Sequence, residues 1–218
     1  MRRYDYLRDP DAIYRDSFAR IRAAVDLSAL PPGIDMLAER LIHACGMPEI
    51  LPDLAFTPDL PAAVRAALDA GRPVLCDAEM VVHGIIRARL PAGQPVLCFL
   101  NDPAAREIGR RDGTTRSAAA VELWRPHLQG AVVAIGNAPT ALFRLLEILD
   151  EADAPRPAAI LGFPVGFVGA AESKAALIAD AAGIPYATLR GRRGGSAMAA
   201  AALNALAGPA GIGGGETA

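Results

Sequence analysis

Five short apolar segments set the strongest limit on how this chain can fold. Each contains few polar residues, and each is followed by a stretch with the periodicity of a helix. A strand that is apolar on both sides must be buried on both faces, which is typical of a parallel sheet between two helical layers. Right-handed crossovers then give an α/β fold, with a doubly wound, mainly parallel sheet and helices on both faces. The predicted strands lie at 73–76, 95–99, 131–135, 158–161 and 186–189, and the predicted helices at 78–87, 116–128, 139–151, 172–182 and 196–207.

An N-terminal helical arm is predicted before the sheet. Asp9 and Pro10 have the residue types of an N-cap and a first helical position. Apolar residues recur at helical spacing from Tyr14 to Val25, so they share one helix face. A second helix is predicted over 33–45, because a glycine and a proline follow it closely.

Length and composition limit the domain count and the class of partner. We expect residues 1–207 to form a single domain and the Gly-rich stretch 208–218 to be a disordered tail. The formal net charge of −2 argues against a nucleic-acid-binding protein. The three cysteines form no CxxC pair, and no apolar run is long enough for a membrane span. These features predict a cytoplasmic protein with neither a membrane anchor nor a thiolate metal site.

The loops that follow the predicted strands favour an anionic ligand. In this fold class ligands bind beyond the carboxyl ends of the strands. The loop 190–196 combines three arginines, which pair with carboxylates or phosphates, with three glycines, which allow close approach of a ligand. The loop is also compatible with a solvated turn, and it lacks the GK[ST] ending of a phosphate-binding P-loop. After the strand at 131–135, Asn137 begins a turn whose free amides would point at a bound acid.

The three histidines are the candidates for proton transfer near neutral pH. His43 lies on the second predicted helix, His83 follows the first strand and His127 lies at a predicted helix end. They do not form a metal-binding pattern, and a structural role is the more common one for a lone histidine. The residues themselves therefore predict an α/β enzyme for an anionic ligand, and a phosphate- or nucleotide-binding transferase stays open at this point.

Eight stretches of the sequence, in order, resemble the precorrin-8X methylmutase family, also called the precorrin isomerases. They are longer and more specific than any single Gly-rich loop, and they cover about residues 6 to 207. The matching stretches are YLRDP at 6–10, IYRDSF at 13–18, IHACG at 42–46, CDAEMV at 76–81, TTRSAAA at 114–120, GNAPTAL at 136–142, PVGFVGAAESK at 164–174 and GRRGGSA at 191–197.

This resemblance implies an isomerase of cobalamin biosynthesis. The family moves a methyl group from C-11 to C-12 of precorrin-8X and forms hydrogenobyrinic acid, with neither a metal nor an organic cofactor. The family's catalytic histidine falls on His43, the proton donor to the macrocycle, and its substrate-contacting serine falls on Ser17. The family's proteins are homodimers with sites near the subunit interface. For the carboxylates of the tetrapyrrole substrate we expect contacts from Arg116, Asn137, Arg192, Arg193, Gly194 and Gly195.

A few positions depart from the family's pattern. His83 stands where a small residue is usual, Ile86 where a threonine is usual, and Phe99 is bulkier than the usual residue. Because these changes lie in one segment, an alternative is a corrinoid-binding paralogue with altered substrate preference or no turnover. The motifs do not distinguish metal-free from cobalt-containing substrate. Lys174, the single lysine beside 21 arginines, is expected to form a salt bridge on a helix surface.

Overall fold

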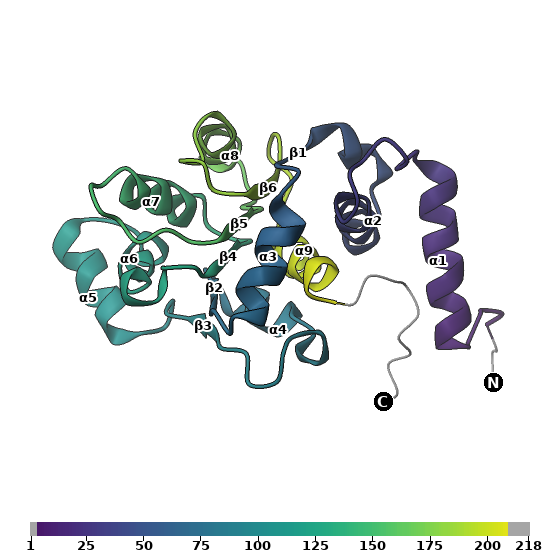
Figure 1. Ribbon diagram of the computed structural model, residues 1–218, viewed down its shortest axis with the longest axis horizontal. Helices are drawn as coiled ribbons and strands as arrows, with labels where there is room; N and C mark the ends of the chain where they lie inside the picture. The colour runs from purple at the N-terminus through teal and green to yellow at the C-terminus, as the bar shows by residue number, and fades with distance from the viewer. Residues whose placement is uncertain (1–3, 209–218) are drawn as a thin grey trace.

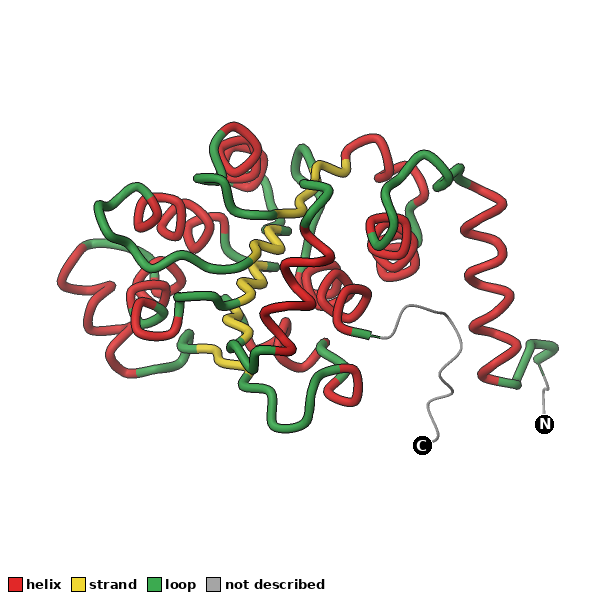
Figure 2. Tube along the Cα trace, viewed as in Figure 1, coloured by secondary structure: helices red, strands yellow, loops and turns green. Residues whose placement is uncertain are grey.

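The computed structural model describes residues 4–208 and contains one central sheet between helices. Figure 2 shows its strands as a continuous band through the molecule. Their order across the sheet is β1, β6, β5, β4, β2, β3. β1 is antiparallel to β6, and all other neighbouring strands are parallel. The strands are β1 Leu54–Phe56, β2 Val74–Cys76, β3 Val96–Cys98, β4 Val132–Ile135, β5 Ala159–Gly162 and β6 Tyr186–Leu189.

The helices cover both faces of the sheet, as Figure 1 shows, with α3, α4 and α9 on one side and α6, α7 and α8 on the other. α2 packs on α9, and α1 packs on α2, so the predicted N-terminal arm is confirmed. The helices are α1 Pro10–Ala24, α2 Ile34–Cys45, α3 Leu60–Asp69, α4 Glu79–Gly84, α5 Pro103–Asp112, α6 Arg116–Glu122, α7 Pro139–Leu149, α8 Ala170–Ala179 and α9 Ser196–Ala207, with 3-10 turns η1 Pro48–Asp53, η2 Arg87–Arg89 and η3 Arg125–His127.

The packing of β2 explains why the predicted strands show no polar alternation. Val74 and Cys76 belong to the core beneath α2, α3, α4 and α9, whereas Leu75 belongs to the core beneath α6 and α7. Side chains of a strand alternate between the two faces, and both faces here are covered by apolar helices. The doubly wound arrangement predicted from the sequence is therefore confirmed.

The structure adds three elements that were not predicted: β1, α3 and α5. β1 is only three residues long and is held by antiparallel pairing with the edge of β6, so no local pattern marks it. α5 does carry a local signal. Asp102 caps it by accepting a hydrogen bond from the amide of Ala104 at 2.8 Å, and Pro103 occupies its first turn.

None of the helices within residues 4–208 has both the length and the apolar character needed to cross a membrane. The predicted disordered tail lies, except for Gly208, outside the residues that the structure describes.

Candidate functional site

Ser17 and His43 form a hydrogen-bonded pair between the two helices of the arm. The Oγ of Ser17 lies 3.0 Å from the Nδ1 of His43. Asp9 starts the first helix by accepting a hydrogen bond from the amide of Asp11 at 3.0 Å, as predicted, and this sets the register that carries Ser17. The next residue, Phe18, is buried and stacks on the His43 ring, with centroids 4.9 Å apart and planes inclined by 18°. The imidazole is therefore held on one side by an aromatic face and at one nitrogen by a hydroxyl.

Burial and the nearby charge of Arg40 both act on the pKa of His43. Its guanidinium lies 5.3 Å from the ring centroids of both Tyr14 and Phe18, where the ring quadrupoles attract a cation. Burial lowers the pKa of His43 below its usual 6.5, and the positive charge of Arg40 lowers it further. At neutral pH the imidazole is mostly uncharged, and its protonated form is a stronger acid than free histidine. No sequence motif pointed to Arg40.

The chain that follows His43 leads to the carboxyl edge of the sheet. Gly46 ends α2 in the left-handed conformation, and η1 follows directly. At the end of η1 the carbonyl of Asp53 accepts a hydrogen bond from the amide of Arg190 at 2.8 Å. Since Leu54 also pairs with Leu189, η1 lies beside the loop that leaves β6. The helical arm and the Arg-rich loop thus meet at one edge of the molecule.

The two predicted arginines of this loop face the arm and the neighbouring loop. The Nη2 of Arg193 lies 3.9 Å from an oxygen of Glu49 in η1. The guanidinium of Arg192 lies 5.5 Å from the centroid of the Phe167 ring. Both arginines are exposed, which suits the recognition of a carboxylate from solvent.

Gly194 and Gly195 have structural roles in the backbone of the loop. A Cβ at Gly194 would come within 2.4 Å of the carbonyl oxygens of Phe163 and Pro164, so only glycine fits there. The amide of Gly195 donates to the carbonyl of Phe163 at 2.8 Å. Sequence reasoning offered these residues as substrate contacts, but the amide of Gly195 is already engaged within the chain.

The expectation for Lys174 was wrong. The side chain is fully buried rather than at a helix surface, and its Nζ donates a hydrogen bond to the backbone carbonyl of Arg193. Burial lowers the pKa of this ammonium to about 8, while the carboxylate of Asp53 acts in the opposite direction. The flexible stem of a lysine reaches the loop from the core side of α8, so Lys174 anchors the loop that carries Arg192 and Arg193.

The amides near Asn137 are not free. The expectation that they point at a bound acid was therefore wrong. Asp77 is buried at the end of β2 and accepts hydrogen bonds from the amides of Gly136 at 2.9 Å, Asn137 at 3.0 Å and Ala138 at 2.8 Å. Burial raises the pKa of Asp77, and the three amides counteract that rise. Strand order reverses between β2 and β4, where α/β folds usually leave a crevice for a ligand. Here a carboxylate of the chain itself occupies the three amides.

Arg116 lies in a different layer from His43. It is exposed in the first turn of α6, just after the cap residue Thr115. A hydrogen bond of 2.8 Å between the hydroxyls of Thr115 and Thr140 brings this helix end beside the turn that holds Asn137. The predicted residues therefore lie in separate places: Arg116 is near Asn137, and His43 pairs with Ser17 on the arm. Arg193 contacts the turn that follows the arm, and Arg192 contacts Phe167.

The three departures from the family pattern do not meet at one place. Phe99 stacks on His127 with ring centroids 5.5 Å apart, against the core beneath α6 and α7. Ile86 lies toward α9, where its amide donates to the side chain of Asn204 at 2.9 Å, and His83 is exposed. Phe99 therefore packs on the opposite face of the sheet from α4, which carries His83 and is followed by Ile86.

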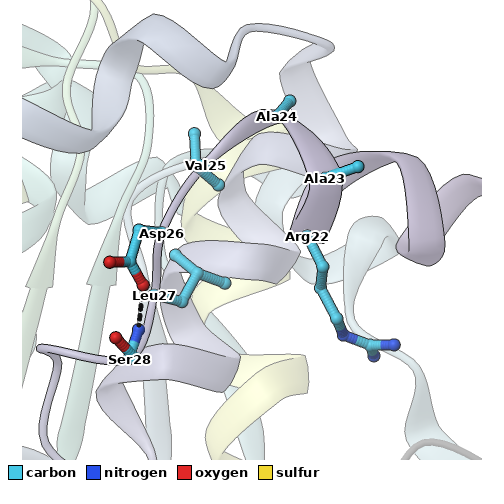
Figure 3. A pocket seen from close by; sticks show the side chains of 7 residues that line it. All are labelled: Arg22, Ala23, Ala24, Val25, Asp26, Leu27 and Ser28. Atoms are coloured by element: carbon cyan, nitrogen blue, oxygen red, sulfur yellow. Dashed lines mark hydrogen bonds between the residues drawn. The ribbon is translucent and has the colours of Figure 1, made fainter.

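A separate hollow of about 550 Å³ opens where α1 ends. Figure 3 shows its lining, in which Asp26 accepts a hydrogen bond from the amide of Ser28 at 2.9 Å while Arg22 points elsewhere. Arg22 lies 2.7 Å from Glu39 of α2. The lining contains none of the predicted site residues. Within residues 4–208 no cluster of three or more histidine, cysteine or carboxylate side chains is arranged to hold a metal ion.

The fold, the histidine–serine pair and the nearby arginines define an α/β enzyme for an anionic ligand. The family model described as "Precorrin-8X methylmutase" matches residues 12–208. The chain belongs to the precorrin-8X methylmutase family, as the sequence motifs predicted, and is an isomerase of the intramolecular-transferase type in cobalamin biosynthesis. Membership in this family replaces the phosphate-binding transferase that the loop at 190–196 had left open.

Named relatives and solved structures agree with this assignment. The precorrin-8X methylmutase of Pseudomonas aeruginosa is 61% identical over 93% of this chain and 97% of its own length. That of a Sinorhizobium species is 59% identical over 96% and 99%. A solved precorrin-8X methylmutase structure from Thermus thermophilus superposes with a TM-score of 0.80 at 36% identity, covering 90% of this chain and 94% of the other.

Proposed function

We propose that this enzyme converts precorrin-8X to hydrogenobyrinic acid with His43 as the proton donor to the macrocycle. The observation that carries the proposal is the hydrogen bond of 3.0 Å between the Oγ of Ser17 and the Nδ1 of His43. If the serine hydroxyl donates to Nδ1, the proton of the neutral imidazole resides on Nε2. That nitrogen is then the one available for the substrate.

The role of His43 is to stabilise the shifted π-system. Migration of a methyl group from C-11 to C-12 breaks one C–C bond and forms another within the same molecule, so no external group is consumed. A hydrogen bond or proton given to a macrocycle nitrogen favours the electron distribution of the product, so stabilisation increases along the reaction coordinate. The lowered pKa makes the protonated form of His43 a stronger acid than free histidine, and in that form Nδ1 donates to the Ser17 hydroxyl.

The carboxylates of the substrate are assigned to the exposed cations at the same edge. Arg192 and Arg193 lie beside the arm that carries His43, as the contact between Arg193 and Glu49 supports. Arg116 and the side chain of Asn137 are proposed to bind carboxylates at the opposite rim of the macrocycle. In this proposal Gly194 and Gly195 contribute by fixing the backbone of the loop that carries Arg192 and Arg193.

We further propose that the metal-free tetrapyrrole is the natural substrate. The two relatives named precorrin-8X methylmutase are 61% and 59% identical, whereas the relative from Methanothermobacter thermautotrophicus named cobalt-precorrin-8 methylmutase is 38% identical. Parallel assays with both substrates test this, and a higher kcat/KM for the cobalt form contradicts it.

We also propose that the protein is a cytoplasmic homodimer with its active site near the subunit interface. The exposed apolar side chains of Tyr6, Leu7 and Ile13 on the arm support a subunit contact there. Light scattering of the purified protein gives the oligomeric state.

We also propose that residues 1–207 fold as one domain, which a single cooperative unfolding transition would support.

The deciding experiment mixes purified protein with precorrin-8X and follows the visible spectrum. Conversion to the spectrum of hydrogenobyrinic acid is the expected result. Binding of the pigment without conversion would instead favour the corrinoid-binding paralogue. Absence of both binding and conversion would contradict either function.

A further inference from the structure

The loop between β5 and α8 presents two apolar side chains to solvent. Phe167 is 85% exposed and Val168 is 88% exposed, more than any other large hydrophobic residue within residues 4–208. Figure 1 places this loop at the end of β5, where the sheet meets α8. Adjacent apolar side chains exposed at the ligand-binding edge of an α/β sheet mark a contact surface rather than part of the core.

This loop is tied firmly to the loop that leaves β6. The amide of Gly166 donates to the carbonyl of Arg192 at 3.3 Å, and the amide of Gly195 donates to the carbonyl of Phe163 at 2.8 Å. From below, buried Lys174 donates to the carbonyl of Arg193. A surface held in this way is ordered before it meets a ligand, so binding costs little conformational entropy.

Charge and apolar area coincide on this surface. The guanidinium of Arg192 lies 5.5 Å from the centroid of the Phe167 ring, within the range of a cation–π contact. Neither group is buried. A phenyl face beside an arginine complements a flat apolar ring system that carries carboxylates at its rim.

The loop that carries Arg192 contacts the turn that follows the helix of His43. Arg193, next to Arg192, lies 3.9 Å from Glu49 in η1. The same turn accepts the amide of Arg190 through Asp53 at 2.8 Å. Since η1 directly follows the helix that carries His43, the loop between β6 and α9 lies between the loop with Phe167 and the end of the arm.

We propose that Phe167 and Val168 form an apolar platform on which the tetrapyrrole macrocycle lies, while Arg192 binds a carboxylate at its rim. The inference rests on the proposed function and adds the residues that determine recognition of the ring face. It makes Phe167 a specificity-determining residue, distinct from the proton donor.

The test is a visible-absorbance titration with hydrogenobyrinic acid as the probe, paired with the precorrin-8X conversion assay. Phe167→Ala is expected to raise the Kd for hydrogenobyrinic acid about tenfold. Phe167→Trp, which keeps an aromatic face, is expected to retain binding within about threefold of wild type. Because the two side chains touch the same ligand, Phe167→Ala combined with Arg192→Gln is expected to cost less than the product of the two separate effects.

Met80→Ala is the matched control. Met80 is also a large exposed apolar residue, 61% exposed, but it lies on α4, across the sheet from α8. The control is expected to bind hydrogenobyrinic acid as wild type does. A Phe167→Ala variant with an unchanged Kd and KM, while wild type converts precorrin-8X, overturns the platform and leaves the proposed function standing.

Two further outcomes distinguish the proposals. Wild type that binds hydrogenobyrinic acid without converting precorrin-8X overturns the proposed function, and a weakened Phe167→Ala titration would still support the platform. A Phe167→Ala variant that changes oligomeric state in light scattering, yet binds hydrogenobyrinic acid with the wild-type Kd, assigns the surface to a subunit contact and overturns the platform.

Discussion

The hydroxyl of Ser17 lies 3.0 Å from the Nδ1 of His43, although 25 residues separate the two positions in the chain. The contact exists because α1 packs against α2 and brings Phe18 onto the imidazole. In the proposed function, the Nε2 of His43 is the nitrogen that meets the substrate. The predictions below begin with this pair.

His43→Ala is expected to slow the conversion of precorrin-8X by at least about a hundredfold, because the general acid is removed. His127→Ala is the matched control, since that histidine is also exposed and stacks on a phenylalanine with planes inclined by 18°. Single-turnover absorbance measures both rates, and circular dichroism verifies folding. Full activity in His43→Ala would show that the proton comes from elsewhere.

Ser17→Ala is expected to lower kcat about tenfold with a smaller effect on KM, because the imidazole loses the hydrogen bond that orients it. Ser28→Ala, at an exposed position in the loop after α1, should leave both constants unchanged. Steady-state assays of the two variants make the comparison. If the two serine variants behave alike, the contact with Nδ1 has no role in the reaction.

The pH dependence of kcat/KM reports the protonation state of His43. If protonated His43 is the donor, kcat/KM falls as pH rises through a pKa that lies below 6.5, owing to burial and then to the charge of Arg40. Arg40→Gln removes a positive charge that opposes protonation, so the inflection should move to higher pH. NMR titration of the three histidines provides an independent reading. An inflection that does not move would show that the charge of Arg40 does not affect the pKa of His43.

The lowered pKa of Lys174 predicts that the free energy of unfolding rises with pH. The pKa of this lysine is about 8 in the folded chain and 10.5 for an unperturbed side chain, so the unfolded state binds more protons between these values. The free energy of unfolding therefore increases by up to about 3 kcal/mol from pH 8 to 10.5.

The cysteines oppose this rise, because burial raises the pKa of the Cys98 thiol to about 11. The informative quantity is thus the difference between wild type and Lys174→Met in urea unfolding across the same pH range. Parallel curves for the two proteins would contradict a lowered pKa at Lys174.

Asp77→Asn is expected to destabilise the fold by about 2–4 kcal/mol, because an amide nitrogen would replace one oxygen that faces the backbone amides. Asp102→Asn is the matched control. Asp102 caps α5 through one hydrogen bond, and asparagine caps a helix about as well. Urea unfolding at pH 7 gives both values. Equal losses in the two variants would mean that the three contacts of Asp77 contribute no more than one.

Most of the architecture is encoded locally in the sequence. The apolar strands, the capped first helix and the stop at Gly46 were predicted from spacing and residue type, and the structure confirms them. β1 was missed because pairing with β6, rather than its own three residues, makes it a strand. Family motifs identified His43 and Ser17 in the sequence, whereas Arg40 had no local signal.

What the sequence determined by itself is therefore the α/β class and the family, since these depend on residue type and spacing along the chain; His43 and Ser17 stay predictions for the reacting residues. Tertiary structure alone decided which polar groups are already paired. It buried Lys174 beneath the carbonyl of Arg193 and gave the amide of Asn137 to Asp77. Both outcomes have one physical cause: a buried polar group must find a partner, and that partner is supplied by packing rather than by sequence proximity.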